Sequence, residues 1–220
     1  MLTNQGILDP RVIKFMTRLN PASYQDFVDL LYSDLDGILR EIQASRKLTV
    51  KKYPDVNSDE TVFKVFEDDI NTQIVRDLKL LNYDAVHDKF DNGHVDIHVE
   101  VSGFPFKWLG ESKIWKGTSK IEGGFKQLLE DYSTGEDNAN CGGVLIYAVD
   151  TDYNTNQMLK IWYEDLEKAG KDSTRNQNLQ GLTLEWPDEN KNIFYSTQIH
   201  PHSGLSGYKV RHCILNLKSK

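Results

Sequence analysis

Apolar residues recur at helical spacing in the first third of the chain. One series falls three or four positions apart, at Phe27, Leu30, Leu31, Leu35, Ile38, Leu39 and Ile42. A second series follows the same spacing, at Val62, Phe66, Ile70, Ile74, Leu78 and Leu81. Each spacing is typical of one buried helix face, and the second predicts a helix over residues 60–81. Because Pro54 and Asn57 interrupt the chain between the two series, we expect an N-terminal helical extension over residues 1–56 and a second domain over 57–220.

Alternating apolar and polar residues follow the second helix. From His94 to Val101 every second residue is apolar, which predicts a strand with Val95, Ile97, Val99 and Val101 on one face and Asp96 on the polar face. We expect a weaker strand over residues 83–90 and another over 106–115. The short connections between these segments favour an antiparallel meander.

Helical and strand patterns alternate in the second half of the chain. The predicted elements are a helix over 119–132, a strand buried on both faces over 142–149, a helix over 158–166, a polar loop over 170–191, and strands over 193–199 and 208–217. The predicted fold class is therefore α/β, with a mixed β-sheet flanked by helices.

Three charged residues on consecutive predicted strands carry the main chemical signal. Asp96 lies on the polar face of its strand, and Glu111 and Lys113 share one face of the next because they are two positions apart. If these strands pair, the three side chains converge. Two carboxylates supply oxygen ligands for Mg²⁺, a Lewis acid toward phosphoryl oxygens, and a neighbouring ammonium stabilises charge that develops there.

This arrangement resembles the signature of the PD-(D/E)xK, or restriction-endonuclease-like, nuclease superfamily, in which an Asp is followed by Glu-x-Lys on the adjacent strand. The resemblance covers residues 58–149. It implies a restriction-endonuclease-like sheet, Asp96 and Glu111 as metal ligands that are also catalytic, and Lys113 as a catalytic lysine.

The helices on either side of the predicted meander extend the resemblance. It implies Glu67 as a further metal ligand and Gln127 as a further catalytic residue, although either is also a plausible plain helix-surface residue. Lys120, Gly124, Gln127 and Asp131 share one polar helix face by spacing. In one subgroup a tyrosine follows the glutamine by four positions, whereas Tyr132 here follows by five.

The function implied by the resemblance is metal-dependent hydrolysis of phosphodiester bonds, with Mg²⁺ or alternatively Mn²⁺ as cofactor. We expect DNA rather than RNA as the substrate, and a bacterial or phage-defence effector with a protein partner or a homo-oligomeric state. Lys116 and Lys120 are candidate phosphate contacts, although surface lysines are commonly only solvated. Two alternatives stay open: an RNase on the same fold, and a catalytically inactive protein-interaction subunit.

The charge distribution bears on a nucleic-acid partner. The formal net charge is −7, which taken alone argues against binding a phosphate backbone. Residues 107–126, however, carry five lysines against two glutamates, and residues 190–220 carry five basic residues and no acid. Residues 127–167 hold nine acids and one lysine. We therefore expect nucleic acid to bind on one basic face, with dependence on metal and salt.

The remaining composition excludes several classes. No apolar run approaches the ~18 residues of a membrane helix, and the first residues lack the layout of a secretory signal, so we expect no membrane association and a cytoplasmic location. Cys141 and Cys213 are the only cysteines and are expected to be core residues. His200 and His202 have no companion ligands at zinc-site spacing, and we expect them in a solvated loop.

Overall fold

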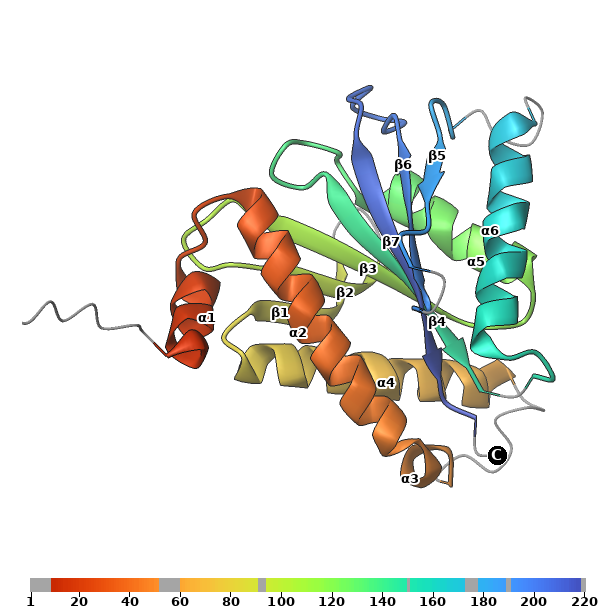
Figure 1. Ribbon diagram of the computed structural model, residues 1–220, viewed down its shortest axis with the longest axis horizontal. Helices are drawn as coiled ribbons and strands as arrows, with labels where there is room; N and C mark the ends of the chain where they lie inside the picture. The colour runs from red at the N-terminus through yellow and green to blue at the C-terminus, as the bar shows by residue number, and fades with distance from the viewer. Residues whose placement is uncertain are drawn as a thin grey trace, which may run out of the picture.

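A seven-stranded mixed sheet, in the order β1-β2-β3-β4-β7-β6-β5, forms the centre of the computed structural model (Figure 1). The structure describes residues 9–51, 60–90, 94–149, 151–172, 178–188 and 191–218. The strands are β1 (Asp84–Phe90), β2 (His94–Glu100), β3 (Lys107–Ile114), β4 (Cys141–Ala148), β5 (Thr183–Glu185), β6 (Ile193–Gln198) and β7 (Tyr208–Asn216). The helices are α1 (Pro10–Leu19), α2 (Tyr24–Ala44), α3 (Arg46–Lys51), α4 (Glu60–Leu80), α5 (Thr118–Lys126), the π-helix η1 (Gln127–Tyr132) and α6 (Thr155–Lys171). The predicted α/β class with a mixed sheet is confirmed.

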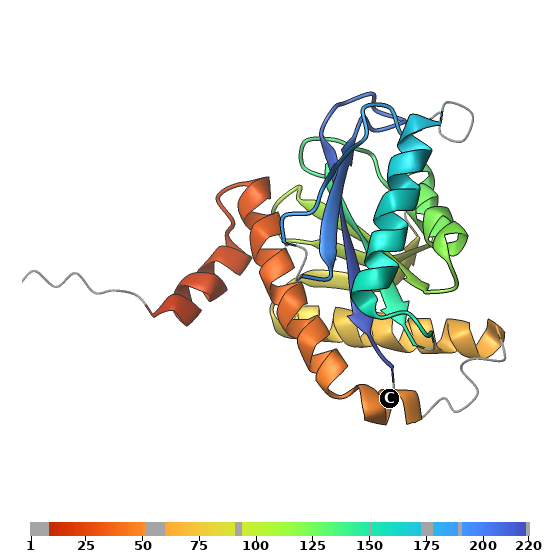
Figure 2. The ribbon, with the colours of Figure 1, turned by 45° about the vertical axis from the view of Figure 1, so that its right-hand side comes forward.

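Helices cover both faces of the sheet (Figures 1 and 2). The apolar faces of α2 and α4 pack on one face, in a cluster that includes Trp108 and Leu145. α5, η1 and α6 pack on the other face, in a cluster that includes Val144 and Ile146. The N-terminal helix α2 therefore shares its core with the sheet, while the predicted boundary between residues 56 and 57 lies outside the described residues.

β4 lies in the middle of the sheet and is its most apolar strand. All eight of its residues are buried, and it pairs in parallel with β3 on one side and β7 on the other. Its side chains alternate between the two clusters, so both faces of the strand need apolar residues. The prediction of a strand buried on both faces is confirmed.

β1, β2 and β3 form the predicted antiparallel meander. The predicted alternation along β2 holds for Ile97, Val99 and Val101, which pack with α2 and α4. Val95 differs, because it packs in the cluster of α5 and α6. This change of side coincides with the place where β2 stops pairing with β3, beyond Ile97.

Four expectations from the second half of the chain need correction. The helix predicted over 119–132 is an α-helix only to Lys126 and continues as a π-helix, and the predicted loop over 170–191 contains the short strand β5. The helix over 158–166 is longer, from Thr155 to Lys171. His200 is buried rather than solvated, and its Nε2 lies 2.8 Å from the hydroxyl of Ser133. Both cysteines are buried, as expected.

No helix within the described part of the chain is both long enough and apolar enough to cross a membrane.

Candidate active site

β2 and β3 separate at the position of the predicted site residues. Beyond Gly110 the two strands no longer pair, so the N–H groups on that edge of β3 need other acceptors. Ser112 N–H donates to Asp96 Oδ2 over 2.8 Å, and Ile114 N–H donates to Glu67 Oε2 over 2.9 Å. Two carboxylates thus take the place of strand pairing, and this fixes the position of both.

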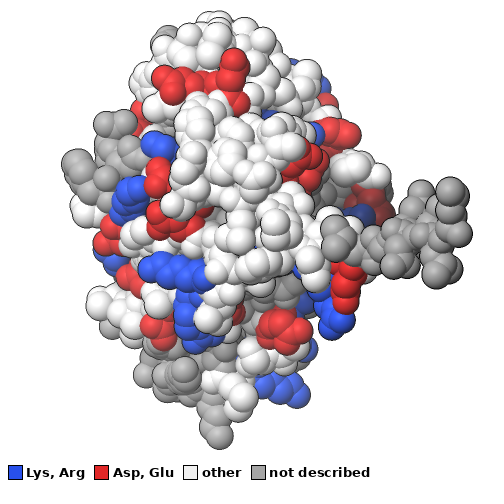
Figure 3. Space-filling model, turned by 90° about the vertical axis from the view of Figure 1, so that its left-hand side faces the viewer, with Lys and Arg blue, Asp and Glu red and all other residues white. Residues whose placement is uncertain are grey.

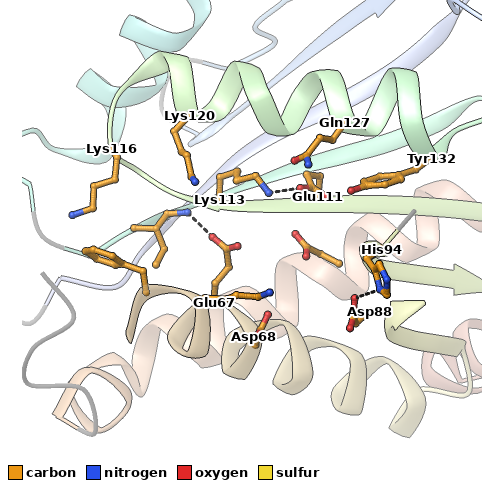
Figure 4. A pocket seen from close by; sticks show the side chains of 14 residues that line it. Glu67, Asp68, Asp88, His94, Glu111, Lys113, Lys116, Lys120, Gln127 and Tyr132 are labelled. Carbon is orange, nitrogen blue, oxygen red and sulfur yellow. Dashed lines mark hydrogen bonds and ion pairs between the residues drawn. The ribbon is translucent and has the colours of Figure 1, made fainter. Parts of the chain in front are cut away.

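A cavity of about 790 Å³ opens at this fork between the strands (Figure 4). Its lining includes all seven residues selected from the sequence: Glu67, Asp96, Glu111, Lys113, Lys116, Lys120 and Gln127. The other lining residues are Phe63, Lys64, Asp68, Asp88, His94, Ile114 and Tyr132. One cavity is therefore lined by residues from α4, β2, β3, α5 and η1. The sequence predicted only some of these lining residues.

Glu111 and Lys113 form a buried ion pair under α5. The Lys113 ammonium donates to Glu111 Oε1, and the side chains are 15% and 2% exposed, respectively. The second carboxylate oxygen, Glu111 Oε2, is buried and has no hydrogen-bond partner among the described residues. Burial and the nearby charge of Asp96 raise the pKa of Glu111 to about 8. The site therefore holds a buried acceptor that lacks a positive or donating partner.

Glu67 reaches the same cavity from α4. Burial raises its pKa to about 7 although the charge of Lys113 opposes the rise, and Asp96 adds to it. The pKa of Lys113 is raised despite its burial, because Glu111, Asp96 and Glu67 stabilise its charged form. Neighbouring carboxyl groups contribute to the raised pKa values of Glu67, Glu111 and Lys113 alike. In this cavity the carboxyl groups outnumber the positive charges close to them.

The π-helix η1 explains the unusual tyrosine spacing. In a π-helix the hydrogen bonds run from residue i to i+5, and Ser133 N–H bonds to the carbonyl of Leu128 over 3.1 Å. Residues five positions apart therefore lie on nearly the same side, and Gln127 and Tyr132 both line the cavity. The predicted polar face is only partly right, because Asp131 is exposed and does not line this cavity.

Gly124 allows α5 to lie directly over the ion pair. A Cβ atom at this position would be 2.8 Å from Lys113 Cγ and 3.2 Å from Glu111 Cγ. Both distances are shorter than normal van der Waals contact, so a larger residue would displace the lysine or the helix.

The two ends of the cavity differ in charge (Figure 4). Lys116 and Lys120 lie toward one end, where the Lys116 ammonium is 3.9 Å from the centre of the Phe63 ring. Asp88 and His94 lie toward the other end, with His94 Nδ1 2.9 Å from Asp88 Oδ1. Asp88 has a left-handed backbone with φ 53°, a conformation that non-glycine residues adopt at a cost and that is concentrated at functional sites.

Carboxylate oxygens of the kind that bind divalent cations line the cavity, but they are not grouped as a ligand set. Within the described residues, no group of three or more His, Cys, Asp or Glu is arranged to hold a metal ion. One oxygen of Glu111 is bonded to Lys113, and one oxygen of Asp96 is bonded to Ser112. Mg²⁺ needs only one or two protein carboxylates, since water and substrate phosphate supply its other ligands. The unpartnered Glu111 Oε2 is an oxygen of the required kind.

Comparison with protein-family models, curated proteins and solved structures finds no match to this chain. The α/β class is observed in the structure, whereas the restriction-endonuclease-like assignment stays a prediction from the motif.

Proposed function

We propose that this protein is a metal-dependent nuclease of the PD-(D/E)xK type that hydrolyses phosphodiester bonds in DNA. The observation that carries the proposal is the state of Glu111. It is buried beside Asp96, one of its oxygens is bonded to Lys113, and the other has no partner among the described residues. An ion pair with a purely structural role needs one carboxylate beside the lysine, and a second carboxylate such as Asp96 only adds repulsion. A site that binds a cation and a phosphate uses both carboxylates.

Each charged residue has a role in this proposal. Asp96 and Glu111 would hold Mg²⁺ or Mn²⁺, with Glu67 as a possible third carboxylate. The cation would supply Lewis-acid activation of the phosphate and of the attacking water. Lys113 orients that water and stabilises the negative charge that develops on the phosphoryl oxygens.

Two further groups extend the site along a bound strand. Gln127 lines the cavity from η1, where its amide can contact the nucleic-acid backbone. Lys116 and Lys120, toward one end of the cavity, would hold phosphates flanking the scissile bond. The chemistry acts on the phosphate, so these contacts suit DNA and RNA alike, and the preference for DNA rests on the resemblance.

A nuclease panel tests the proposal. Purified wild type and Lys113→Ala are incubated with double-stranded DNA, single-stranded DNA and RNA, each with Mg²⁺ or Mn²⁺. We expect wild type to cut DNA only with metal, and Lys113→Ala to lose about 10²–10³-fold in rate. Thermal unfolding of both proteins checks that the variant is folded. Equal cleavage by the folded variant would overturn the mechanism, and cleavage of RNA alone would establish the RNase alternative.

A second candidate function, a protein-interaction subunit, is favoured by helix α1. None of its residues is buried, and it exposes five large apolar side chains: Val12, Ile13, Phe15, Met16 and Leu19. The side of the molecule that carries α1 is largely uncharged over its centre (Figure 3). Contiguous exposed apolar patches of this kind commonly contact other proteins. In this role the chain would assemble through α1 without cleaving nucleic acid.

Sedimentation of wild type and Met16→Glu tests whether the contact is with a second copy of this chain. We expect a concentration-dependent dimer that the glutamate abolishes. A wild type that stays monomeric at all concentrations would exclude the homo-oligomer.

A further inference from the structure

A buried chain of hydrogen bonds runs behind the metal-facing side of the site. Tyr147 OH donates to Asn71 Oδ1 over 2.6 Å, Asn71 Nδ2 donates to Ser112 Oγ over 2.7 Å, and Ser112 Oγ lies 2.9 Å from Asp96 Oδ2. Asn71, Ser112 and Tyr147 are completely buried. These hydrogen bonds join β4, α4, β3 and β2 in that order. They therefore run from the middle of the sheet to the fork between β2 and β3.

The orientation of the Asn71 amide in the structure sets the direction of every hydrogen bond in this network. The amide nitrogen of Asn71 can only donate, so Ser112 Oγ accepts from it and turns its own hydrogen toward Asp96. The amide oxygen of Asn71 can only accept, and Tyr147 supplies the donor. Asp96 Oδ2 therefore receives two hydrogen bonds from Ser112, one from N–H and one from the hydroxyl.

Asn71 and Glu67 are coupled by their place on one helix. They lie four residues apart on α4 and so share a helix face, from which Glu67 reaches the cavity and Asn71 reaches beneath the fork. A small shift of α4 would therefore move the Glu67 carboxylate and the Asn71 amide together.

We propose that Asn71 is a positioning residue that fixes the orientation of the Asp96 carboxylate through Ser112. The inference rests on the proposed function, since it assigns Asp96 to the metal. With Oδ2 held by Ser112, the rotation of the carboxylate is set, and its other oxygen is presented to the cation in one orientation. Groups that orient a ligand in this way contribute about 10–100-fold to metal affinity.

Metal affinity without nucleic acid tests this inference. Titration calorimetry measures the Kd of Mn²⁺ for wild type, Asn71→Leu and Asn71→Asp at a pH of about 8.5, where the carboxyl groups of the site are largely ionised. Asn71→Leu removes the donor to Ser112. Asn71→Asp also gives the Ser112 hydroxyl a competing acceptor, so its hydrogen is drawn away from Asp96. We expect Mn²⁺ affinity to fall about 10–100-fold in both variants.

Ser196→Ala is the matched control, because Ser196 is a buried serine whose hydroxyl lies 2.9 Å from His212 Nε2, in a hydrogen-bonded pair that does not include Asp96. We expect this variant to keep the wild-type Kd even where its melting temperature falls. Tyr147→Phe is the mildest change to these hydrogen bonds, because the Asn71 amide can still donate to Ser112. It should weaken Mn²⁺ binding only a few-fold.

Wild-type Mn²⁺ affinity in folded Asn71→Leu and Asn71→Asp would overturn the positioning role while leaving the proposed function intact. If neither folds, an unchanged Kd in Tyr147→Phe would overturn it. A wild type that binds no Mn²⁺ and cuts no nucleic acid would instead contradict the proposed function itself.

Discussion

Glu67 and Glu111 are carboxyl groups whose environment opposes their charged form. Burial raises their pKa values to about 7 and 8, against an ordinary value of 4.5. The folded protein therefore holds these protons more tightly than the unfolded chain does. Their contribution to stability is fully present below a pH of about 4.5 and is lost as the pH rises through 7 and 8.

We accordingly expect the metal-free protein to become less stable as the pH rises from about 5 to about 8. Urea unfolding across this pH range measures the trend. Glu111→Gln, which cannot ionise, should show a shallower decline. A stability that rises over the same range in wild type would show that these carboxyl groups are not buried as described.

Gly124 and Gly123 give a matched pair of variants in α5. A Cβ at Gly124 would contact Lys113, whereas a Cβ at Gly123 meets nothing within 4 Å. We expect Gly124→Ala to lower the cleavage rate at least tenfold by displacing the lysine. Gly123→Ala should keep the rate and raise the free energy of unfolding by about 0.5–1 kcal/mol, because alanine favours the helix. Equal cleavage rates for the two variants would contradict the close packing of α5 on the site.

The sequence predicted the residues of the site that follow from the two-residue period of strands. Glu111 and Lys113 could be placed on one strand face on this basis alone, whereas the alternation beside Asp96 breaks at Val95. Asn71 and Tyr147 could not, because their contacts join segments that are far apart in the chain. Nothing in the sequence separates Asn71 from Thr72 and Gln73, the other polar residues between Ile70 and Ile74.

α1 is attached to the rest of the molecule mainly through polar contacts. Arg18 forms two hydrogen bonds with the buried Asp34 of α2, at 2.7 and 2.8 Å, and Tyr83 OH donates to the same carboxylate over 2.8 Å. Loss of the arginine would leave a buried carboxylate without its main partner.

We expect Arg18→Ala to lower the free energy of unfolding by about 2–3 kcal/mol, somewhat less than for a fully buried pair. Lys14→Ala, on the same helix, removes only an exposed hydrogen bond to Ser33 and should change stability by less than about 0.5 kcal/mol. Urea unfolding of both variants measures the difference. Equal stabilities would show that the Arg18–Asp34 contact does not hold α1.

Element boundaries were predictable where a periodic pattern is long, and not where it is short or ambiguous. The stripe of residues 119–132 fits an α-helix and a π-helix equally well, and only the spacing of Gln127 and Tyr132 indicated the difference. β5 has three residues, which leaves too few positions for alternation to show.

The local charge of the cavity at the fork between β2 and β3 bears on how an acidic protein could bind nucleic acid. The net charge of −7 includes the site carboxylates without a cation, while Lys116 and Lys120 contribute local positive charge. Only this small part of the surface needs to be attractive to phosphate.

We therefore expect DNA binding to depend on salt through a few phosphate contacts, including those of Lys116 and Lys120. In a Lys113→Ala background, which prevents turnover, Lys116→Ala with Lys120→Ala should reduce the slope of log affinity against log salt by about 2. Lys168→Ala, on the exposed side of α6, should leave the slope unchanged. Fluorescence anisotropy with Mg²⁺ present measures both slopes, and an unchanged slope in the double variant would place the DNA elsewhere.

The most direct test of metal-dependent hydrolysis at this site is the initial rate of DNA cleavage by wild type and Glu111→Gln at saturating Mg²⁺. Glutamine keeps the size of the side chain and removes its charge, so folding is expected to be preserved. The proposed site predicts cleavage by wild type that requires Mg²⁺ and a loss of about 10³-fold or more in the variant. Equal rates in the two proteins, or a wild type inactive on every nucleic acid with every metal, would contradict it.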